Sequence, residues 1–331
     1  MKPFCLLLVL FLSCQRGTPD NSALMTNDEV FQYAHQFVRW FYNDQLDSLS
    51  QHINNKNFTL DDLKRFKVQA EDQLGKEEEL LFDRNFIYVK DGKTNYENIR
   101  DCRFSRSARP VRILFGFDNQ QTIYKFEVSI LPREAHTTHI NYQTKTKLKL
   151  PFEGEWYVAS GGRTVLHNGH AISANQRFAY DFLIKKEGYT FRNEGKYNKD
   201  YFCFEKNVVA PGKGRVFKVI NHIEENEVGK MGEGDGNTVV IDHGNGEYSV
   251  IAHFKKGSIV VEVGDEVNSG QFLGLCGNSG RSFQPHIHYH LQTMPENGPG
   301  EGLPLQFASY KLDSISHENS EPTWGQRIRN Q

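Results

Sequence analysis

The sequence predicts an α+β module followed by a mainly β domain built on an antiparallel sheet. In the first part, apolar residues recur at helical spacing in two segments between residues 26 and 74. From residue 148 onward, short β-branched runs alternate with Gly-Asn, Gly-Asp and Ser-Gly turns, a pattern typical of a β domain. The 331 residues are enough for two domains that each bury a core.

Each of the two predicted helices begins at a threonine that can cap it. Thr26 stands three residues before Glu29, which is the spacing of a capping box. Thr59 takes the same position in the second helix, and Gly75 ends that helix. The apolar stripes of the two helices are predicted to be Val30, Ala34, Phe37, Val38 and Phe41, and Leu63, Phe66, Ala70 and Leu74.

A predicted hairpin follows the helices. Residues 122–130, "TIYKFEVSI", alternate between apolar and polar side chains, as in a half-buried strand. Residues 111–117, "VRILFGF", are the expected partner strand, with "DNQQ" as the turn. We assign residues 26–147 to this α+β module, which resembles the cystatin-like and NTF2-like modules of exported proteins. It contains no catalytic constellation, so we expect a scaffold or a docking module.

The first residues form a predicted export signal. Lys2 precedes an apolar stretch from Phe4 to Leu12, which is the pattern of a signal peptide. Ser13 and Cys14 follow this stretch, and the end of the segment resembles a bacterial lipobox, in which the cysteine is lipidated; a plain cleaved signal is the alternative. The resemblance implies a signal over residues 1–14, a tether over residues 15–25, and a protein anchored by lipid to a membrane of the bacterial cell envelope.

Composition excludes several other classes of function. The formal net charge of −2 gives no indication of a nucleic-acid partner. Beyond the signal only Cys102, Cys203 and Cys276 remain, so at most one disulfide can form, and no C-x-x-C pair suggests a thiolate zinc site. H-E-x-x-H and G-x-S-x-G are both absent. Cys276 lies near a histidine-rich segment, but we expect it to pack as a small buried residue.

Residues 285–292, "PHIHYHLQ", place histidines at every second position. In a strand, His286, His288 and His290 would therefore project from one face. Three further segments offer side chains that could bind a metal. They contain His167, His170 and Asp181; His253; and Asp242 with His243, the last two in a predicted solvent-exposed hairpin loop.

Imidazole and carboxylate groups in this number suit a zinc site. Catalytic zinc takes three protein ligands and keeps one position open for water. The metal lowers the pKa of that water, and neighbouring imidazoles can move its proton or stabilise an oxyanion. The histidines and the carboxylate are therefore fit for the hydrolysis of an amide bond with one Zn²⁺ ion.

The order of these segments resembles the M23 family of zinc metallopeptidases, of the lysostaphin and LytM type. The resemblance is carried by "NGH", "QRFAYD", "GNTVVIDHGNGEYSVIAHF" and "GQFLGLCGNSGRSFQPHIHYHL". It covers roughly residues 148–292, and the glycine-rich turn that leads into H-x-H is its most specific part. It implies a LytM-like β-sheet peptidase domain, which we assign to residues 148–310, with residues 311–331 as a C-terminal tail.

The resemblance also implies a role for each residue. His170, Asp181 and His288 correspond to the zinc ligands, and His253 and His286 to the catalytic imidazoles. The implied activity is zinc-dependent endopeptidase cleavage of the peptide cross-links of peptidoglycan, so peptidoglycan peptides are the expected partners.

Some alternatives stay open at this point. Many members have the first histidine and the aspartate four apart, whereas His170 and Asp181 are eleven apart, so His167 is a rival for the first ligand. His290 is expected either to hydrogen-bond a ligand imidazole or to be a satisfied core histidine. A non-catalytic LytM-like binding or activator module, and a zinc peptidase acting on other peptides, are the alternative functions.

Overall fold

The structure is a computed structural model that describes residues 7–11, 24–53, 59–296 and 300–331. The chain divides into two compact units, Met1–Leu131 and Pro132–Gln331. The first combines helices with an antiparallel sheet and the second is mainly β, so the predicted fold class is confirmed. Within the described ranges, no helix is both long and apolar enough to cross a membrane.

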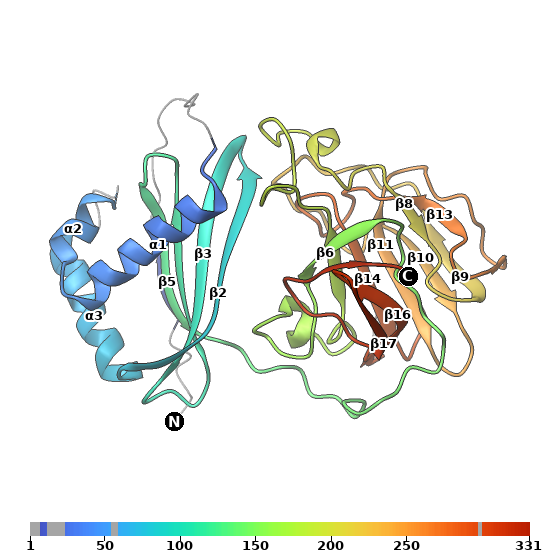
Figure 1. Ribbon diagram of the computed structural model, residues 1–331, viewed down its shortest axis with the longest axis horizontal. Coiled ribbons are helices and arrows are strands. Elements are labelled where there is room, and N and C mark those ends of the chain that lie inside the picture. The colour runs from blue at the N-terminus through green and yellow to red at the C-terminus, as the bar shows by residue number, and fades with distance from the viewer. Residues whose placement is uncertain (1–6, 12–23, 54–58, 297–299) are drawn as a thin grey trace. The chain divides into compact units, whose positions relative to one another are not determined.

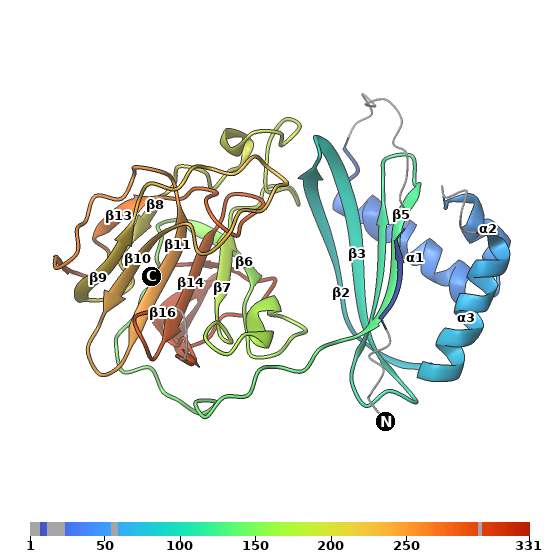
Figure 2. The same ribbon diagram turned by 180° about the vertical axis from the view of Figure 1, so that it is seen from behind.

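The first unit is a sheet with helices on one face. Its strand order is β1-β5-β4-β3-β2. Helix α1 crosses the sheet in front of the strands in Figure 1 and lies behind them in the reverse view of Figure 2. The elements are α1 (Asn27–Tyr42), α2 (Leu46–Gln51), α3 (Leu60–Leu74), β1 (Leu7–Phe11), β2 (Glu77–Lys90), β3 (Lys93–Phe104), β4 (Val111–Phe117) and β5 (Ile123–Ile130).

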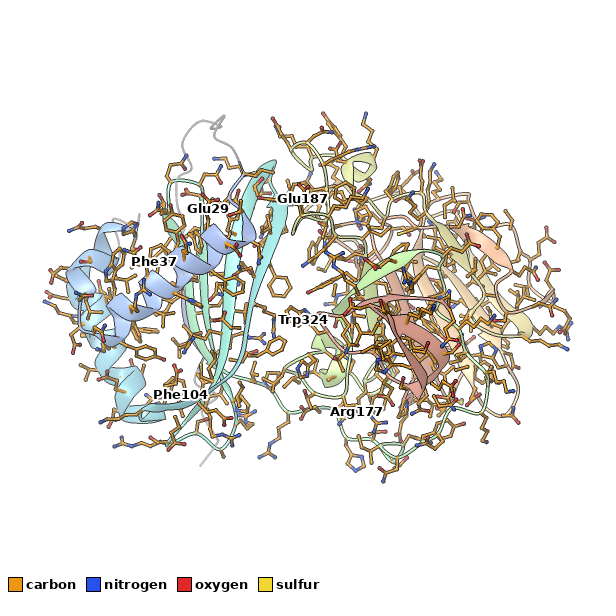
Figure 3. The ribbon with its side chains drawn as sticks, viewed as in Figure 1. Glu29, Phe37, Phe104, Arg177, Glu187 and Trp324 are labelled. Atoms are coloured by element: carbon orange, nitrogen blue, oxygen red, sulfur yellow. The ribbon has the colours of Figure 1, made fainter. Side chains whose placement is uncertain are left out.

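The helices form as the sequence predicts. Thr26 and Thr59 both make capping boxes, and Gly75 ends α3 with a positive φ of 78°. Every residue of the two predicted apolar stripes is buried. Phe37, labelled on α1 in Figure 3, packs 5.7 Å from the ring of Phe115 on the sheet. The long β2–β3 hairpin was not predicted, because its strands mix charged and apolar residues without a clean alternation.

The second unit is organised around one long antiparallel sheet. Among the described residues its order is β12-β9-β10-β11-β14-β7-β6-β18-β16-β17, with β15 beside β14 and a separate β8–β13 pair. Figure 2 shows β9, β10, β11, β14 and β7 side by side. The strands are β6 (Glu155–Ser160), β7 (Tyr180–Leu183), β8 (Asn207–Val209), β9 (Gly214–Ile220), β10 (Asn237–Asp242), β11 (Tyr248–Phe254), β12 (Glu266–Val267), β13 (Phe272–Leu275), β14 (Ile287–Gln292), β15 (Gly302–Leu303), β16 (Phe307–Leu312), β17 (Ile315–Ser320) and β18 (Arg327–Arg329).

The boundary between the units lies before Pro132, whereas the sequence placed it after residue 147. The buried carboxylate of Glu247 explains the difference. It accepts hydrogen bonds from the hydroxyl of Tyr142 and from the backbone N–H groups of Lys145 and Thr146. Residues 142–146 are thereby hydrogen-bonded to the β10–β11 turn. This contact is long-range, so no local sequence pattern predicts it.

The two ends of the chain also differ from their assignments. Residues 311–331, expected to be a tail, contribute β17, β18 and the end of β16, and Ile328 is fully buried beside β6. Within the predicted signal, Leu7–Phe11 pairs with β5 as strand β1. Cys14 and most of the tether lie outside the described residues, so the signal and its lipidation stay predictions.

Candidate metal centre

Strand pairing brings two of the candidate ligands together. In β14, His288 lies opposite Asp181 of β7 and opposite Ala252 of β11. The side chains of His288 and Asp181 share the same face, with His288 Nδ1 3.0 Å from Asp181 Oδ1. The sheet therefore supplies one imidazole and one carboxylate from segments more than a hundred residues apart in the sequence.

The third candidate ligand comes from a short 3₁₀ helix, η1 (Gly169–Ile172). The side-chain oxygen of the buried Asn168 accepts a hydrogen bond from the backbone N–H of His170, 2.9 Å away. The side-chain amide of Asn168 donates in turn to the carbonyls of Gly162 and Arg177. This anchoring places His170 Nε2 2.8 Å from Asp181 Oδ2.

His170, Asp181 and His288 therefore form one cluster. One donor atom from each lies within 4.8 Å of the other two, and the rings of His170 and His288 are 4.8 Å apart in an edge-on arrangement. Two imidazole nitrogens and a carboxylate oxygen are a donor set that zinc accepts. The predicted ligands thus meet around one point, and the residues present fit a divalent cation.

The charges at this point favour an ionised aspartate. Burial alone would raise the pKa of Asp181, but the neighbouring His170 and His286 outweigh it and hold that pKa well below its usual range. Burial would lower the pKa of His170, and the adjacent Asp181 raises it instead. The cluster therefore offers a carboxylate anion that a cation can bind directly.

His253 sits at a β-bulge beside the cluster. Thr238 pairs with Ala252 and Asn237 with Phe254, so His253 is the extra residue of β11, and its φ is +67°. A bulge of this kind turns a side chain toward a site at local backbone cost. The ring of His253 lies 4.7 Å from that of His286, and burial holds its pKa well below the usual value.

Backbone carbonyls select the tautomers of both imidazoles. His253 Nδ1 lies 2.8 Å from the carbonyl oxygen of Ser279, and His286 Nδ1 lies 2.9 Å from that of Gln284. A carbonyl only accepts, so each Nδ1 carries the proton and each neutral ring keeps a lone pair on Nε2. His286 Nε2 is 3.6 Å from Asp181 Oδ1 and therefore faces the cluster.

His290 lies on the other side of His288 from Asp181 in the hydrogen-bond network. Its Nδ1 lies 3.0 Å from His288 Nε2, and its Nε2 lies 3.2 Å from the side-chain oxygen of Gln292. His290 is thus hydrogen-bonded to a candidate ligand rather than part of the ligand cluster.

Other sequence candidates lie elsewhere. His167 hydrogen-bonds within its own turn, and the cluster is completed by His170 instead. Asp242 and His243 occupy the opposite end of the β10–β11 hairpin from His253. His243 is half-buried, which is less exposed than the sequence predicted, because its ring nitrogens contact the carbonyl of Lys213 and the hydroxyl of Ser249.

Sequence reasoning missed the residues that hold the imidazoles. Asn168 and Ser279 are fully or almost fully buried, and Gln176 hydrogen-bonds the ring of His170. Their positions next to the motifs were visible, but a polar residue near a turn has many uses, so the sequence alone gave no reason to single them out.

Comparison with known proteins gives partial matches. Residues 198–299 match the model of Peptidase family M23, a segment that includes His253, His286 and His288. Endolysin 2638A of Staphylococcus phage 2638A is 34% identical over 143 residues, which are 39% of this chain and 27% of the endolysin. Peptidoglycan DD-endopeptidase ShyA of Vibrio cholerae is 42% identical over 72 residues, which are 21% of this chain and 16% of that protein. The matches therefore span only about a quarter of these relatives or less.

Among solved structures, a zinc-containing peptidase from Vibrio cholerae covers 60% of this chain and 53% of its own, with 17% sequence identity and a TM-score of 0.29.

Proposed function

We propose that this chain is a zinc-dependent endopeptidase of family M23 that hydrolyses amide bonds in the peptide part of peptidoglycan. The observation that carries the proposal is the convergence of His170, Asp181 and His288 with two further imidazoles beside them. The match of residues 198–299 to the family model supports the family, and the similarity to a peptidoglycan DD-endopeptidase of Vibrio cholerae supports the substrate class.

The three cluster residues would hold the ion through one donor atom each. Zinc bound there would supply Lewis acidity, which activates water at neutral pH and polarises a peptide carbonyl. The remaining work falls to the protein side chains. Asp181 would offset the positive charge of a bound ion, and the strands β7 and β14 keep the carboxylate and His288 in register.

His253 and His286 are suited to move protons. Each ring has its Nδ1–H directed at a backbone carbonyl, so Nε2 is the atom that can accept a proton and later release it to a leaving amine. A protonated Nε2 can also donate a hydrogen bond to an oxyanion. The negative charge of Asp181 raises the pKa of His286, against the effect of burial, and a bound cation would offset that charge.

The experiment is a zinc assay joined to a turnover assay on the full chain. We expect one zinc ion per wild-type chain and release of soluble peptides from purified peptidoglycan sacculi. His170→Ala and Asp181→Ala should bind zinc more weakly than the wild type and should lose peptide release. His167→Ala is the matched control, since His167 lies three residues away and outside the cluster, and it should keep both.

Two results would reject parts of this proposal. A wild type that binds no zinc and releases no peptides would be a binding module rather than an enzyme. A wild type that cleaves unrelated peptides but leaves sacculi intact would be a zinc peptidase with a different substrate.

Export and anchoring complete the proposal. We place the protein in the cell envelope, attached to a membrane through a lipid on Cys14. Incorporation of labelled palmitate into the wild type, and its loss in Cys14→Ser, would support the anchor. If the wild type takes up no label, the lipid anchor is wrong and the segment is a plain cleaved signal.

A further inference from the structure

One face of β14 is polar although it is buried. Its other face is an ordinary core face, and there Ile287, Tyr289 and Leu291 join the hydrophobic core. The polar face continues past the candidate ligand His288 to His290 and Gln292, which are 1% and 0% exposed. Buried polar groups are costly unless they are hydrogen-bonded, so this face needs a reason beyond packing.

The hydrogen bonds along this face have a direction. The side-chain oxygen of Gln292 can only accept, so His290 Nε2, 3.2 Å away, carries a proton. Neutral His290 then has a lone pair on Nδ1 and accepts from His288 Nε2, which lies 3.0 Å away. With a cation between the Asp181 carboxylate and His288, the proton on Nε2 would leave a lone pair on His288 Nδ1, the atom that faces Asp181 and would bind the ion.

Gln292 contributes little else in this structure. Its amide nitrogen is buried and has no hydrogen-bond partner among the residues that the structure describes. An unpaired buried donor destabilises a fold, so stability does not explain why an amide stands here. An apolar side chain of similar length would fill the same space without that cost. The side-chain oxygen of Gln292, which accepts a hydrogen bond from His290, explains the presence of an amide at this position.

We infer that His290 and Gln292 are positioning residues that form a directed relay and hold His288 in the tautomer that binds zinc. The inference rests on the proposed function, because it assigns His288 to the metal. Partners of this kind orient a ligand imidazole and raise its basicity.

The test compares three variants on the full chain. Gln292→Met removes the acceptor at nearly constant length, and we expect zinc affinity to fall about tenfold, the lower end of the range for such partners. The Tm of the metal-free protein should stay within a few degrees of the wild type. Gln292→Glu keeps an acceptor and should retain the wild-type affinity. Leu291→Met, one residue away on the core face, should leave zinc affinity unchanged.

A spectroscopic measurement needs no variant. In zinc-bound wild type, ¹⁵N NMR of the ring nitrogens should show His290 protonated on Nε2 and not on Nδ1. Three results would each overturn the relay and leave the zinc peptidase in place. They are a proton on Nδ1 of His290, a wild-type zinc affinity in Gln292→Met, and a loss of zinc affinity in Leu291→Met equal to that in Gln292→Met. A wild type that binds no zinc overturns the proposed function, and the relay with it.

Discussion

The role of His253 can be tested by mutation without removing a metal ligand, because its ring hydrogen-bonds to the carbonyl of Ser279 and lies outside the ligand cluster. In His253→Asn, the group that can accept a proton at Nε2 is lost. Asparagine tolerates a positive φ better than most residues, so it suits the +67° at this position. We expect kcat on peptidoglycan peptides to fall about 10²–10⁴-fold, the usual contribution of a positioned acid or base. The zinc affinity should be unchanged.

The two variants Asn and Ala at position 253 separate the effect on catalysis from the effect on stability. The loss of rate corresponds to about 3–5 kcal/mol of barrier, at about 1.4 kcal/mol for each factor of ten. His253→Ala removes the same imidazole but tolerates the positive φ less well, so it should be about 1 kcal/mol less stable than His253→Asn. For a unit of this size, that difference is about 2–4 °C in Tm.

The assay follows turnover of a purified peptidoglycan peptide by chromatography, with zinc binding measured by titration on the same samples. His243→Asn is the matched control, since His243 lies at the far end of the same hairpin, and its kcat should stay at the wild-type level. Retention of wild-type kcat in His253→Asn would refute the assigned role. Loss of zinc from that variant would show that His253 belongs to the ligand set.

Three further predictions concern the ligands and the attachment of residues 142–146. Asp181→Ala should weaken zinc binding by about two orders of magnitude. Structural zinc sites gain about 10–16 kcal/mol from four ligands, so one ligand contributes about 3 kcal/mol. A titration that shows wild-type zinc affinity would contradict this prediction. Tyr142→Phe removes one hydrogen bond to the buried Glu247 and should cost about 1–3 kcal/mol in denaturant unfolding, whereas an unchanged midpoint would mean that the bond contributes nothing. Burial would raise the pKa of Glu247, but the hydrogen bonds from Thr146, Lys145 and Tyr142 lower that pKa. The carboxylate therefore stabilises the fold above the unfolded-state pKa of about 4.3, and this stabilisation is lost as pH falls below that value. Glu247→Gln should therefore show a shallower fall of Tm from pH 5 to 3 than the wild type, and parallel curves would argue against the assignment.

Local patterns predicted the parts of the fold that local physics decides. The helices followed from Thr26, Thr59 and their apolar stripes, and the β4–β5 hairpin from alternation. The unit boundary did not follow, because Glu247 reaches residues about a hundred positions away. The strand that contains Ile328 was missed for the same reason, since its pairing with β6 is long-range.

The candidate site was predictable as a set of residues but not as an arrangement. The alternating histidines predicted that His288 and His290 share one face of a strand, and the contact between His288 Nε2 and His290 Nδ1 in β14 agrees with this. The choice between His167 and His170 needed the 3₁₀ helix and its Asn168 cap, which depend on contacts with distant carbonyls. The bulge that carries His253 depends on the register between β10 and β11, and no residue type marks it.

The most direct test of the proposed zinc site is anomalous diffraction at the zinc edge from crystals of the zinc-loaded protein. We expect a single peak about 2 Å from His170 Nε2, a carboxylate oxygen of Asp181 and His288 Nδ1, as zinc bonds require. A zinc peak at another place, or one that leaves any of these three side chains out of contact, would contradict it.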